Sequence, residues 1–252
     1  MNRLSRRRWI TTGLAAIAGG TGLAAAAGLA RRYGLVPPDH GGLYGPGETL
    51  TYSAQRLLTR HSLAREFPRD LISKAPFANG PPLKDPAFQR LQAAAFVDWR
   101  LAVDGMVARP ASFSIADLKR FPSNSQVTHL ACEEGWSYIA EWTGARLVHL
   151  LNEVGVHPEA RYIVYYSMEP GAWESIDMAD ALHPQTFLTY AMNGSDLPVG
   201  FGGPLRLRLP RQLGYKSLKY LNRMTVTDDL KSFGKGVGSV SAEFGYSWYA
   251  GI

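Results

Sequence analysis

Cysteine is nearly absent from this chain of 252 residues, because Cys132 is the only one. A single cysteine cannot form an intramolecular disulfide, and it cannot supply the several thiolates that an iron–sulfur cluster generally needs. The six histidines are scattered, and no CxxC, CxxCH, HxH or HExxH spacing occurs. The sequence therefore excludes a structural zinc site and a covalently attached c-type haem.

Acidic residues are absent from the first 32 positions, which hold six arginines. Removing these six from the 27 basic residues of the chain leaves 21, equal to the 21 acidic residues. The net charge of +6 therefore belongs to the N-terminal segment, and the body is neutral. A neutral body has no global field that would attract a phosphate backbone, so we expect no nucleic-acid partner.

The first 35 residues predict an export leader or a membrane anchor. Ser5-Arg6-Arg7-Arg8 precedes an uncharged stretch at residues 10–30, and this pattern resembles a twin-arginine signal. The 21 uncharged residues are long enough to cross a bilayer, but their alanines and glycines gain little in lipid. We expect a removed leader and a periplasmic protein, with an uncleaved inner-membrane anchor as the alternative. The twin-arginine route carries folded proteins, so the leader also hints at a cofactor.

Proline is concentrated in one stretch, because half of the 16 prolines fall between residues 36 and 86. We therefore expect residues 36–95 to form an extended wrapping arm with few long helices, ahead of a body at 96–252. Residue patterns predict strands near 99–103, 126–132, 161–168, 205–209 and 220–227. Ser114, Thr143 and Asp177 are each expected to cap a short helix. Mixed short strands and helices predict a single α+β domain without Rossmann repetition.

Two clusters could carry chemistry. Cys132 is followed by Glu133, Glu134 and a glycine, which indicates a polar loop at a strand end. A lone cysteine is more often a small buried hydrophobe, but an exported thiol risks oxidation unless a metal or another group occupies it. The two glutamates could manage protons, or they could be ordinary exposed carboxylates.

The second cluster is basic and surrounds a turn that contains glycine. It could form a cradle for a phosphate-bearing cofactor, or it could be a solvated basic strand face. Its members are Arg206, Arg208, Lys216, Ser217 and Lys219.

Several stretches together resemble the sulfite oxidase family, and in particular its bacterial periplasmic methionine-sulfoxide reductase catalytic subunits. The sequence Cys-Glu-Glu-Gly-Trp-Ser at 132–137, followed by Glu-Trp-Thr-Gly at 141–144, is similar to the molybdenum-binding cysteine segment of that family. Further similar stretches follow in family order at 99–105, 174–177, 183–186, 192–194, 203–206 and 212–216. The resemblance covers the chain from about residue 65 to its end.

The resemblance implies a mixed α+β sulfite-oxidase fold that binds mononuclear molybdenum through molybdopterin. Cys132 would be the protein ligand of the metal and the catalytic centre. The cofactor contacts that the resemblance implies are Asn79, Ser167, Arg206, Ser217, Leu218 and Lys219. Phe201 departs from the family, because relatives usually carry Asn or His at that position, so one polar contact with the pterin is lost or replaced.

We therefore expect an oxidoreductase that transfers an oxygen atom to or from a small S- or N-oxo substrate. The alternatives are a sulfite dehydrogenase and a non-catalytic pterin-binding or electron-transfer module. Because no haem site is present, electrons would pass through a membrane cytochrome b or a periplasmic cytochrome c. We expect a monomeric catalytic subunit. Tyr246, Trp248 and Tyr249 could line the substrate funnel, or they could be aromatic core.

Overall fold

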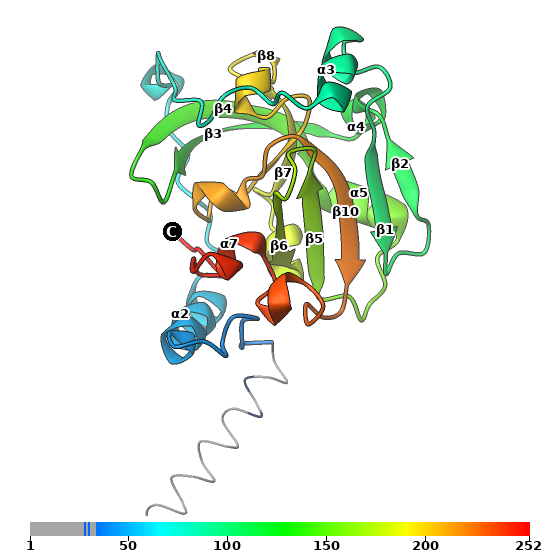
Figure 1. Cartoon of the computed structure of the whole chain (residues 1–252). Helices are drawn as coiled ribbons and strands as arrows, with labels where there is room; N and C mark the ends of the chain where they lie inside the picture. Colours follow the sequence, from blue (N-terminus) through cyan, green and yellow to red (C-terminus); the bar gives the residue numbers. More distant parts are fainter. Residues whose placement is uncertain (1–27, 29, 31–33) are drawn as a thin grey trace, which may run out of the picture.

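The computed structural model describes residues 28, 30 and 34–252, and it contains two five-stranded sheets (Figure 1). The first sheet has the order β2-β1-β10-β5-β6, in which β1 and β10 are parallel and the other pairs are antiparallel. Its strands are β1 (Leu101–Gly105), β2 (Ala111–Phe113), β5 (Tyr162–Ser167), β6 (Trp173–Asp177) and β10 (Leu221–Thr227).

The second sheet is antiparallel, with the order β3-β4-β7-β8, and β9 also pairs with β7. Its strands are β3 (Ser123–Ala131), β4 (Ser137–Arg146), β7 (Phe187–Met192), β8 (Ser195–Asp196) and β9 (Arg206–Arg208). In Figure 1, β3 and β4 cross above the strands of the first sheet. Short helices and 3-10 turns connect the strands: α4 (Ile115–Arg120), α5 (Leu147–Val154), α6 (Met178–Ala181), η2 (Val199–Phe201) and η3 (Gly214–Lys216). The turn η4 (Gly234–Gly236) and helix α7 (Val240–Glu243) follow the last strand.

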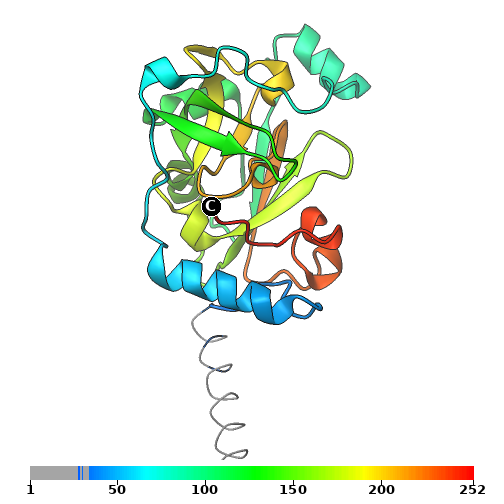
Figure 2. The same cartoon turned by 90° about the vertical axis from the view of Figure 1, so that its left-hand side faces the viewer.

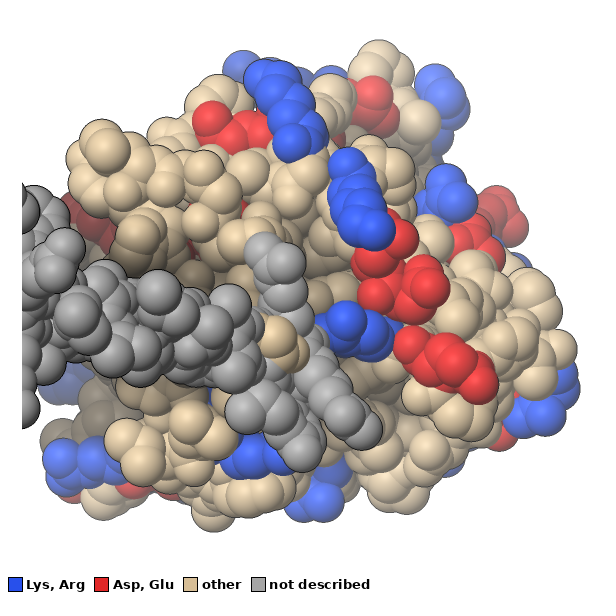
Figure 3. Space-filling view, turned by 90° about the horizontal axis from the view of Figure 1, so that it is seen from below, with Lys and Arg blue, Asp and Glu red and all other residues tan. Residues whose placement is uncertain are grey.

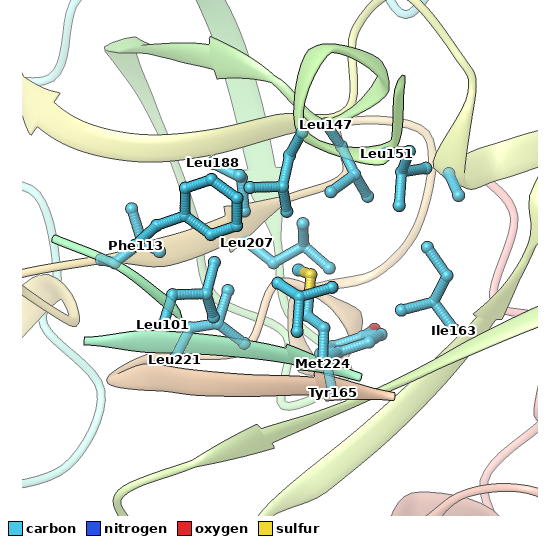
Figure 4. Close-up of a cluster of buried hydrophobic side chains, with 14 of the residues drawn as sticks. Leu101, Phe113, Leu147, Leu151, Ile163, Tyr165, Leu188, Leu207, Leu221 and Met224 are labelled. Carbon is cyan, nitrogen blue, oxygen red and sulfur yellow. The ribbon is translucent and has the colours of Figure 1, made fainter. Parts of the chain in front are cut away.

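The main core lies between the two sheets and helix α5. Figure 4 shows leucines of α5 and of the second sheet pointing toward side chains of the first sheet. Burying one such side chain contributes roughly 1.5–3 kcal/mol, so this layer stabilises the packing of one sheet on the other. Its buried members include Leu147, Leu151, Leu188, Leu207, Leu101, Leu221 and Met224.

Most of the expected elements are present. All five predicted strands occur, with ends shifted by a few residues. Ser114 forms a capping box with Asp117 at the start of α4, and Asp177 accepts a hydrogen bond from the backbone of Asp180 at the start of α6. Both cap predictions are confirmed. The predicted mixed α+β fold is confirmed as well.

The prediction for Thr143 was wrong. Thr143 lies inside β4, where it pairs with Ser125 of β3 and Ala191 of β7, and α5 begins only after Arg146. Its hydroxyl lies 2.7 Å from that of Ser125, across the strand pair. Pairing with two neighbouring strands therefore overrides the local preference of threonine for a helix start.

The proline-rich segment contains one long helix that its composition does not predict. Helix α2 (Gly45–Leu58) has 14 residues, and its only proline, Pro46, lies in the first turn, where a missing N–H has no cost. The rest of the segment is mostly extended, with η1 (Arg69–Leu71) and the eight-residue α3 (Pro86–Ala93). It lies along the second sheet, because Phe67 donates to Val127 and Ser73 donates to Ile139 through their backbones.

The two views of the chain place α2 at one end of the molecule, beside the start of the described chain (Figures 1 and 2). Among the described residues no helix is long and apolar enough to cross a membrane. The predicted leader lies almost wholly outside the described residues.

Candidate active site

Cys132 is presented by a tight turn between β3 and β4. Its backbone N–H donates to the carbonyl of Trp136 at 2.9 Å, and the N–H of Gly135 donates back to the Cys132 carbonyl at 3.1 Å. Gly135 has a φ of +88°, a conformation that glycine adopts without steric cost. The side chain of Cys132 is buried, so the turn holds the thiol in one place.

Two carboxylates lie beside the thiol. Cys132 Sγ donates to Glu133 Oε2 at 3.2 Å and lies 3.9 Å from Glu134 Oε2. Burial and the neighbouring Glu133 carboxylate raise the pKa of Cys132 to about 12. In the cofactor-free protein the thiol is therefore protonated at neutral pH, and it needs a positive centre to become a thiolate.

The thiol opens into a cleft of about 520 Å³ that combines distant parts of the chain. Its walls come from residues 79–84, the turn after β3, residues 169–174, the segment around η3 and the start of α7. The fold brings Cys132 into this cleft together with five of the six residues expected to contact the cofactor: Asn79, Arg206, Ser217, Leu218 and Lys219. Their contacts with the cofactor remain predictions.

Two of these residues are cations without an acidic partner among the described residues. Arg206 is buried, its Nε donates to the Ser217 carbonyl at 2.7 Å, and its Nη1 donates to the Phe201 carbonyl at 3.2 Å. Lys219 Nζ donates to the carbonyls of Asn79 and Gly200 at 2.6 and 2.7 Å. Burial lowers the pKa of Arg206, and burial together with Arg206 lowers that of Lys219 to about 8.

A third cation, Arg208, lies behind the cleft on the same face of β9. Its side chain is buried, its Nη1 donates to Ser217 Oγ at 3.3 Å, and its Nε has no hydrogen-bond partner among the described residues. Burial and the charge of Arg206 lower the pKa of Arg208 to about 9. The alternative of a solvated basic strand face is therefore wrong. Carbonyl oxygens accept hydrogen bonds from a buried cation but do not balance its charge, and the phosphate of a cofactor would balance it.

Ser217, Asn79 and Ser167 are placed differently from one another. Ser217 Oγ accepts from the Leu209 N–H at 3.1 Å, and its own proton remains to be donated. Asn79 is exposed and contacts Lys219 through its backbone carbonyl. Ser167 lies at the end of β5, where its hydroxyl accepts from the Glu169 N–H at 2.9 Å, and it does not line the cleft.

Lys216 does not belong to the phosphate cradle, which corrects the expectation for the basic cluster. It is fully buried, and its Nζ lies 2.7 Å from Glu174 Oε2. The two lysines follow the same glycine-containing turn in the sequence, but Lys216 pairs with Glu174 whereas Lys219 lines the cleft. Glu174 lies in a stretch that resembles the family, but its pairing with Lys216 was not predicted, because the two residues are 42 positions apart in the sequence.

The three aromatic residues near the C-terminus lie in two different environments. Trp248 and Tyr249 are buried in a cluster with Tyr52 of α2, so for them the core interpretation is correct. Tyr246 is half exposed and packs on Tyr215, which lines the cleft, with ring centroids 5.4 Å apart.

Phe201 packs against Tyr138 with ring centroids 5.9 Å apart, and it accepts from Arg206 through its backbone. The side chain of Phe201 thus contributes apolar packing beside the cleft and no polar group. Trp136 also lines the cleft, although the sequence did not single it out as a lining residue.

The described residues contain no group of three or more His, Cys, Asp or Glu side chains that could hold a metal ion. A metal in this cleft would take Cys132 as a protein ligand and its remaining ligands from a cofactor. The residues present therefore fit a metal that arrives on an anionic organic group, because one thiol and unpaired cations line the same cleft.

The comparison that decides the family is a match to the model of the oxidoreductase molybdopterin binding domain, over residues 88–233. This chain belongs to the sulfite oxidase family. It is an oxidoreductase whose cofactor is molybdenum bound to molybdopterin.

Two relatives and one solved structure show how far the similarity extends. The putative protein-methionine-sulfoxide reductase subunit YedZ1 of Azospira oryzae is 35% identical over 195 residues, covering 77% of this chain and 70% of the relative. The protein-methionine-sulfoxide reductase catalytic subunit MsrP of Ralstonia nicotianae is 33% identical over 145 residues, covering 52% and 44%.

The crystal structure of the sulfane dehydrogenase SoxCD from Paracoccus pantotrophus aligns with a TM-score of 0.51 and 26% identity, covering 52% of this chain and 39% of that one. The chain thus spans less than half of MsrP and of SoxCD.

Proposed function

We propose that this oxidoreductase removes an oxygen atom from a neutral sulfoxide, and that oxidation of sulfite is not its reaction. The charge balance of the cleft carries the proposal. Glu133 and Glu169 line it, and Lys84 is the only lining base among the described residues besides the two expected to hold the cofactor phosphate. An anion such as sulfite would therefore meet at least as much negative as positive charge, whereas a neutral sulfoxide would meet no such barrier.

The names of two relatives support the same direction, because both are protein-methionine-sulfoxide reductases or their subunits. The walls of the cleft support it as well. Trp136, Trp173, Tyr215 and Tyr220 line it beside two prolines and two leucines, and such a surface fits the thioether end of a methionine side chain.

The chain's own residues would bind the cofactor, orient the substrate and supply protons to it. Cys132 would hold molybdenum through its thiolate, and Arg206 and Lys219 would bind the phosphate of molybdopterin. The bound cofactor supplies the two-electron oxygen-atom chemistry. Reduction of a sulfoxide to a thioether and water consumes two electrons and two protons. Glu133, which lies in the cleft beside Cys132, is the carboxylate best placed to deliver protons.

The electrons would come from a separate haem protein, either a membrane cytochrome b or a periplasmic cytochrome c. The described part of the chain has no cluster of His, Cys, Asp or Glu side chains for a further metal, and both relatives are named as subunits. The twin-arginine pattern at Ser5–Ile10 supports export to the periplasm, where either carrier would be available.

The test is a substrate panel on protein purified from a molybdenum-replete host. With a reduced viologen dye as donor, we expect turnover with methionine sulfoxide and slower turnover with an N-oxide. With an oxidised acceptor, we expect no oxidation of sulfite above the rate of the cofactor-free protein. Faster turnover of sulfite than of sulfoxide would overturn the proposal and favour the sulfite dehydrogenase.

A further inference from the structure

Helix α2 turns an apolar surface away from the body. Tyr52 and Arg56, one turn apart, are buried against the body, where Tyr52 Oη donates to Asp177 Oδ2 at 2.7 Å. With 3.6 residues per turn, Leu50 and Leu57 fall on the opposite side of the helix. Their side chains are 72% and 67% exposed, so they contact little of the described protein.

The exposed face of α2 and the turn before it carries no charge. Glu48, the only acid of the helix, is half-buried and accepts from Ser247 Oγ at 2.9 Å. A surface helix normally places charged residues outward, so this arrangement is inverted, and apolar patches of this kind mark interaction sites. The exposed residues from position 43 to 58 are Leu43, Tyr44, Pro46, Gly47, Leu50, Thr51, Leu57 and Leu58. We call these eight residues the α2 face.

The α2 face lies where the described chain begins. Ser53 Oγ donates to the Leu35 carbonyl at 2.7 Å, which ties the segment after the leader to this helix. In the sequence, that segment directly follows the uncharged run at 10–30 and Arg31-Arg32. Seen from this end of the molecule, acidic and basic side chains gather on the right of Figure 3, whereas the upper left is largely uncharged.

We propose that the α2 face lies on the surface of a lipid bilayer, with its leucines at the level of the headgroups. Leucines beside a tyrosine with a basic flank are typical of an interfacial helix, and Arg60, two residues after the end of α2, supplies such a flank. The uncharged run would bring this end of the body to a membrane during export. The proposal is independent of which substrate the cleft takes.

A protein occupant fits the face less well. Protein interfaces carry roughly one hydrogen bond per 100–200 Å², which fixes the register of the two partners. Among the side chains of the α2 face, only the hydroxyls of Tyr44 and Thr51 could form such bonds. A bilayer needs none, because its contact with leucine is not directional.

The test places a fluorophore on α2 of the full chain. Cys132 is buried, so an added surface cysteine is labelled selectively. We would label Leu57→Cys with an environment-sensitive dye and use Val97→Cys, at a position 69% exposed, as the matched control. The probe is phosphatidylcholine vesicles containing phosphatidylglycerol, with brominated acyl chains that quench a dye at the bilayer surface.

We expect quenching at position 57 and none at position 97. This readout reports on α2 itself, whether the leader is kept or removed. Adding Leu50→Glu to the Leu57→Cys protein should raise the lipid concentration needed for quenching by roughly tenfold. Adding Leu71→Glu, on η1, should leave it unchanged.

Equal quenching at both positions, or none at either, would overturn the proposal. So would a dye response at position 57 that follows protein concentration rather than vesicles, because it would assign the face to a second copy of the chain. A response that requires a haem protein in the vesicles would assign it to that partner and overturn the proposal as well.

Discussion

At the scale of single residues, the cofactor cleft is distinguished by cations that have no carboxylate partner among the described residues. Arg206 and Arg208 are almost fully buried on one face of a strand, and no carboxylate among the described residues pairs with either. Burying an unpaired cation has a high free-energy cost, and burial lowers the pKa of both guanidinium groups. An anion bound beside them offsets this cost, so binding of the molybdopterin phosphate should stabilise the folded chain.

The first prediction concerns how tightly these charges hold the cofactor. Each of Arg206→Ala and Lys219→Ala removes a charge-assisted contact of roughly 1.5–3 kcal/mol, so cofactor affinity should fall about 10- to 150-fold per substitution. Pterin and molybdenum content per folded chain would be measured. Arg223→Ala is the matched control, since Arg223 pairs with Asp104 on the outside of the first sheet. Unchanged content in the double variant would show that these bases do not bind the phosphate.

The second prediction concerns pH and the cofactor-free protein. Burial lowers the pKa of Lys219 from 10.5 to about 8, so the unfolded chain binds more protons than the folded chain between these values. The free energy of unfolding should therefore rise as the pH increases from 8 to 9. Lys219→Met should remove part of that rise. The measurement is urea unfolding of both proteins at several pH values, and identical slopes would contradict the assignment of Lys219 as a partly buried cation.

The third prediction concerns Cys132. Cys132→Ala deletes the thiolate that would bind molybdenum but leaves the phosphate contacts in place. The variant should fold, keep most of its pterin and lose turnover with every substrate. Its unfolding transition should stay close to that of the parent protein, because the thiol donates only to the carboxylates of Glu133 and Glu134 at the edge of the cleft. Parent-level turnover in the variant would remove Cys132 from the metal site.

At the scale of elements, local sequence patterns predicted the structures that depend on residues close in the sequence. They did not predict the structures that depend on contacts with distant residues. Ser114 caps α4 with partners three residues away, so the sequence contains the whole motif. Thr143 looks like another cap, but two strands from elsewhere hold it in β4. The alternation at 205–209 predicted a strand, whereas only the packed sheet shows that its basic side is buried.

The same limit applies to the candidate site. Most of its residues were predicted from the resemblance to a family whose members share one fold. The spacing of the residues along the chain does not by itself show which of them meet in three dimensions. Lys216 and Lys219 are three residues apart, yet one pairs with Glu174 and the other lines the cleft. The proline content of residues 36–95 does not predict helix α2, because the only proline of that helix lies in its first turn, where it does not interrupt the helix.

The fourth prediction tests the buried pair that supports η3. Lys216 Nζ lies 2.7 Å from Glu174 Oε2, and the backbone N–H of Ser241, at the start of α7, donates to the other oxygen of Glu174 at 3.2 Å. Lys216→Met should destabilise the fold by roughly 3–5 kcal/mol, because it leaves Glu174 buried and unpaired. Lys216→Met combined with Glu174→Leu should recover much of this loss.

Chemical unfolding of the two variants would measure the effect, and their cofactor content would show what the pair does for the cleft. Ser217 and Lys219 directly follow η3, so the single variant should also bind less cofactor than its stability alone requires. A single variant as stable as the parent protein would show that the pair is not structurally important.

At the scale of the whole molecule, charge is separated along the chain. The six arginines without acids lie before residue 33, and the remainder has equal numbers of acids and bases. Such a body offers little long-range steering to a charged partner, so encounters with a redox protein should depend on short-range contacts. Redox encounters often bury little area, which fits a transient docking of this kind.

The fifth prediction follows from this neutrality and from the redox balance of the proposed reaction. Each reduction of a sulfoxide consumes two electrons, which a separate donor must replace before the next turnover. If a haem protein delivers them, removing the candidate cytochromes from the host should abolish turnover with the physiological donor. Turnover with a reduced dye should be retained, because the dye reaches the cleft directly.

In the reconstituted system, raising the salt concentration from 50 to 200 mM should change the rate of electron delivery by less than about threefold, since a neutral body is steered only weakly. Full physiological turnover by the isolated chain would contradict the external donor. A steep salt dependence would instead show that a local charged patch guides docking despite the balanced total.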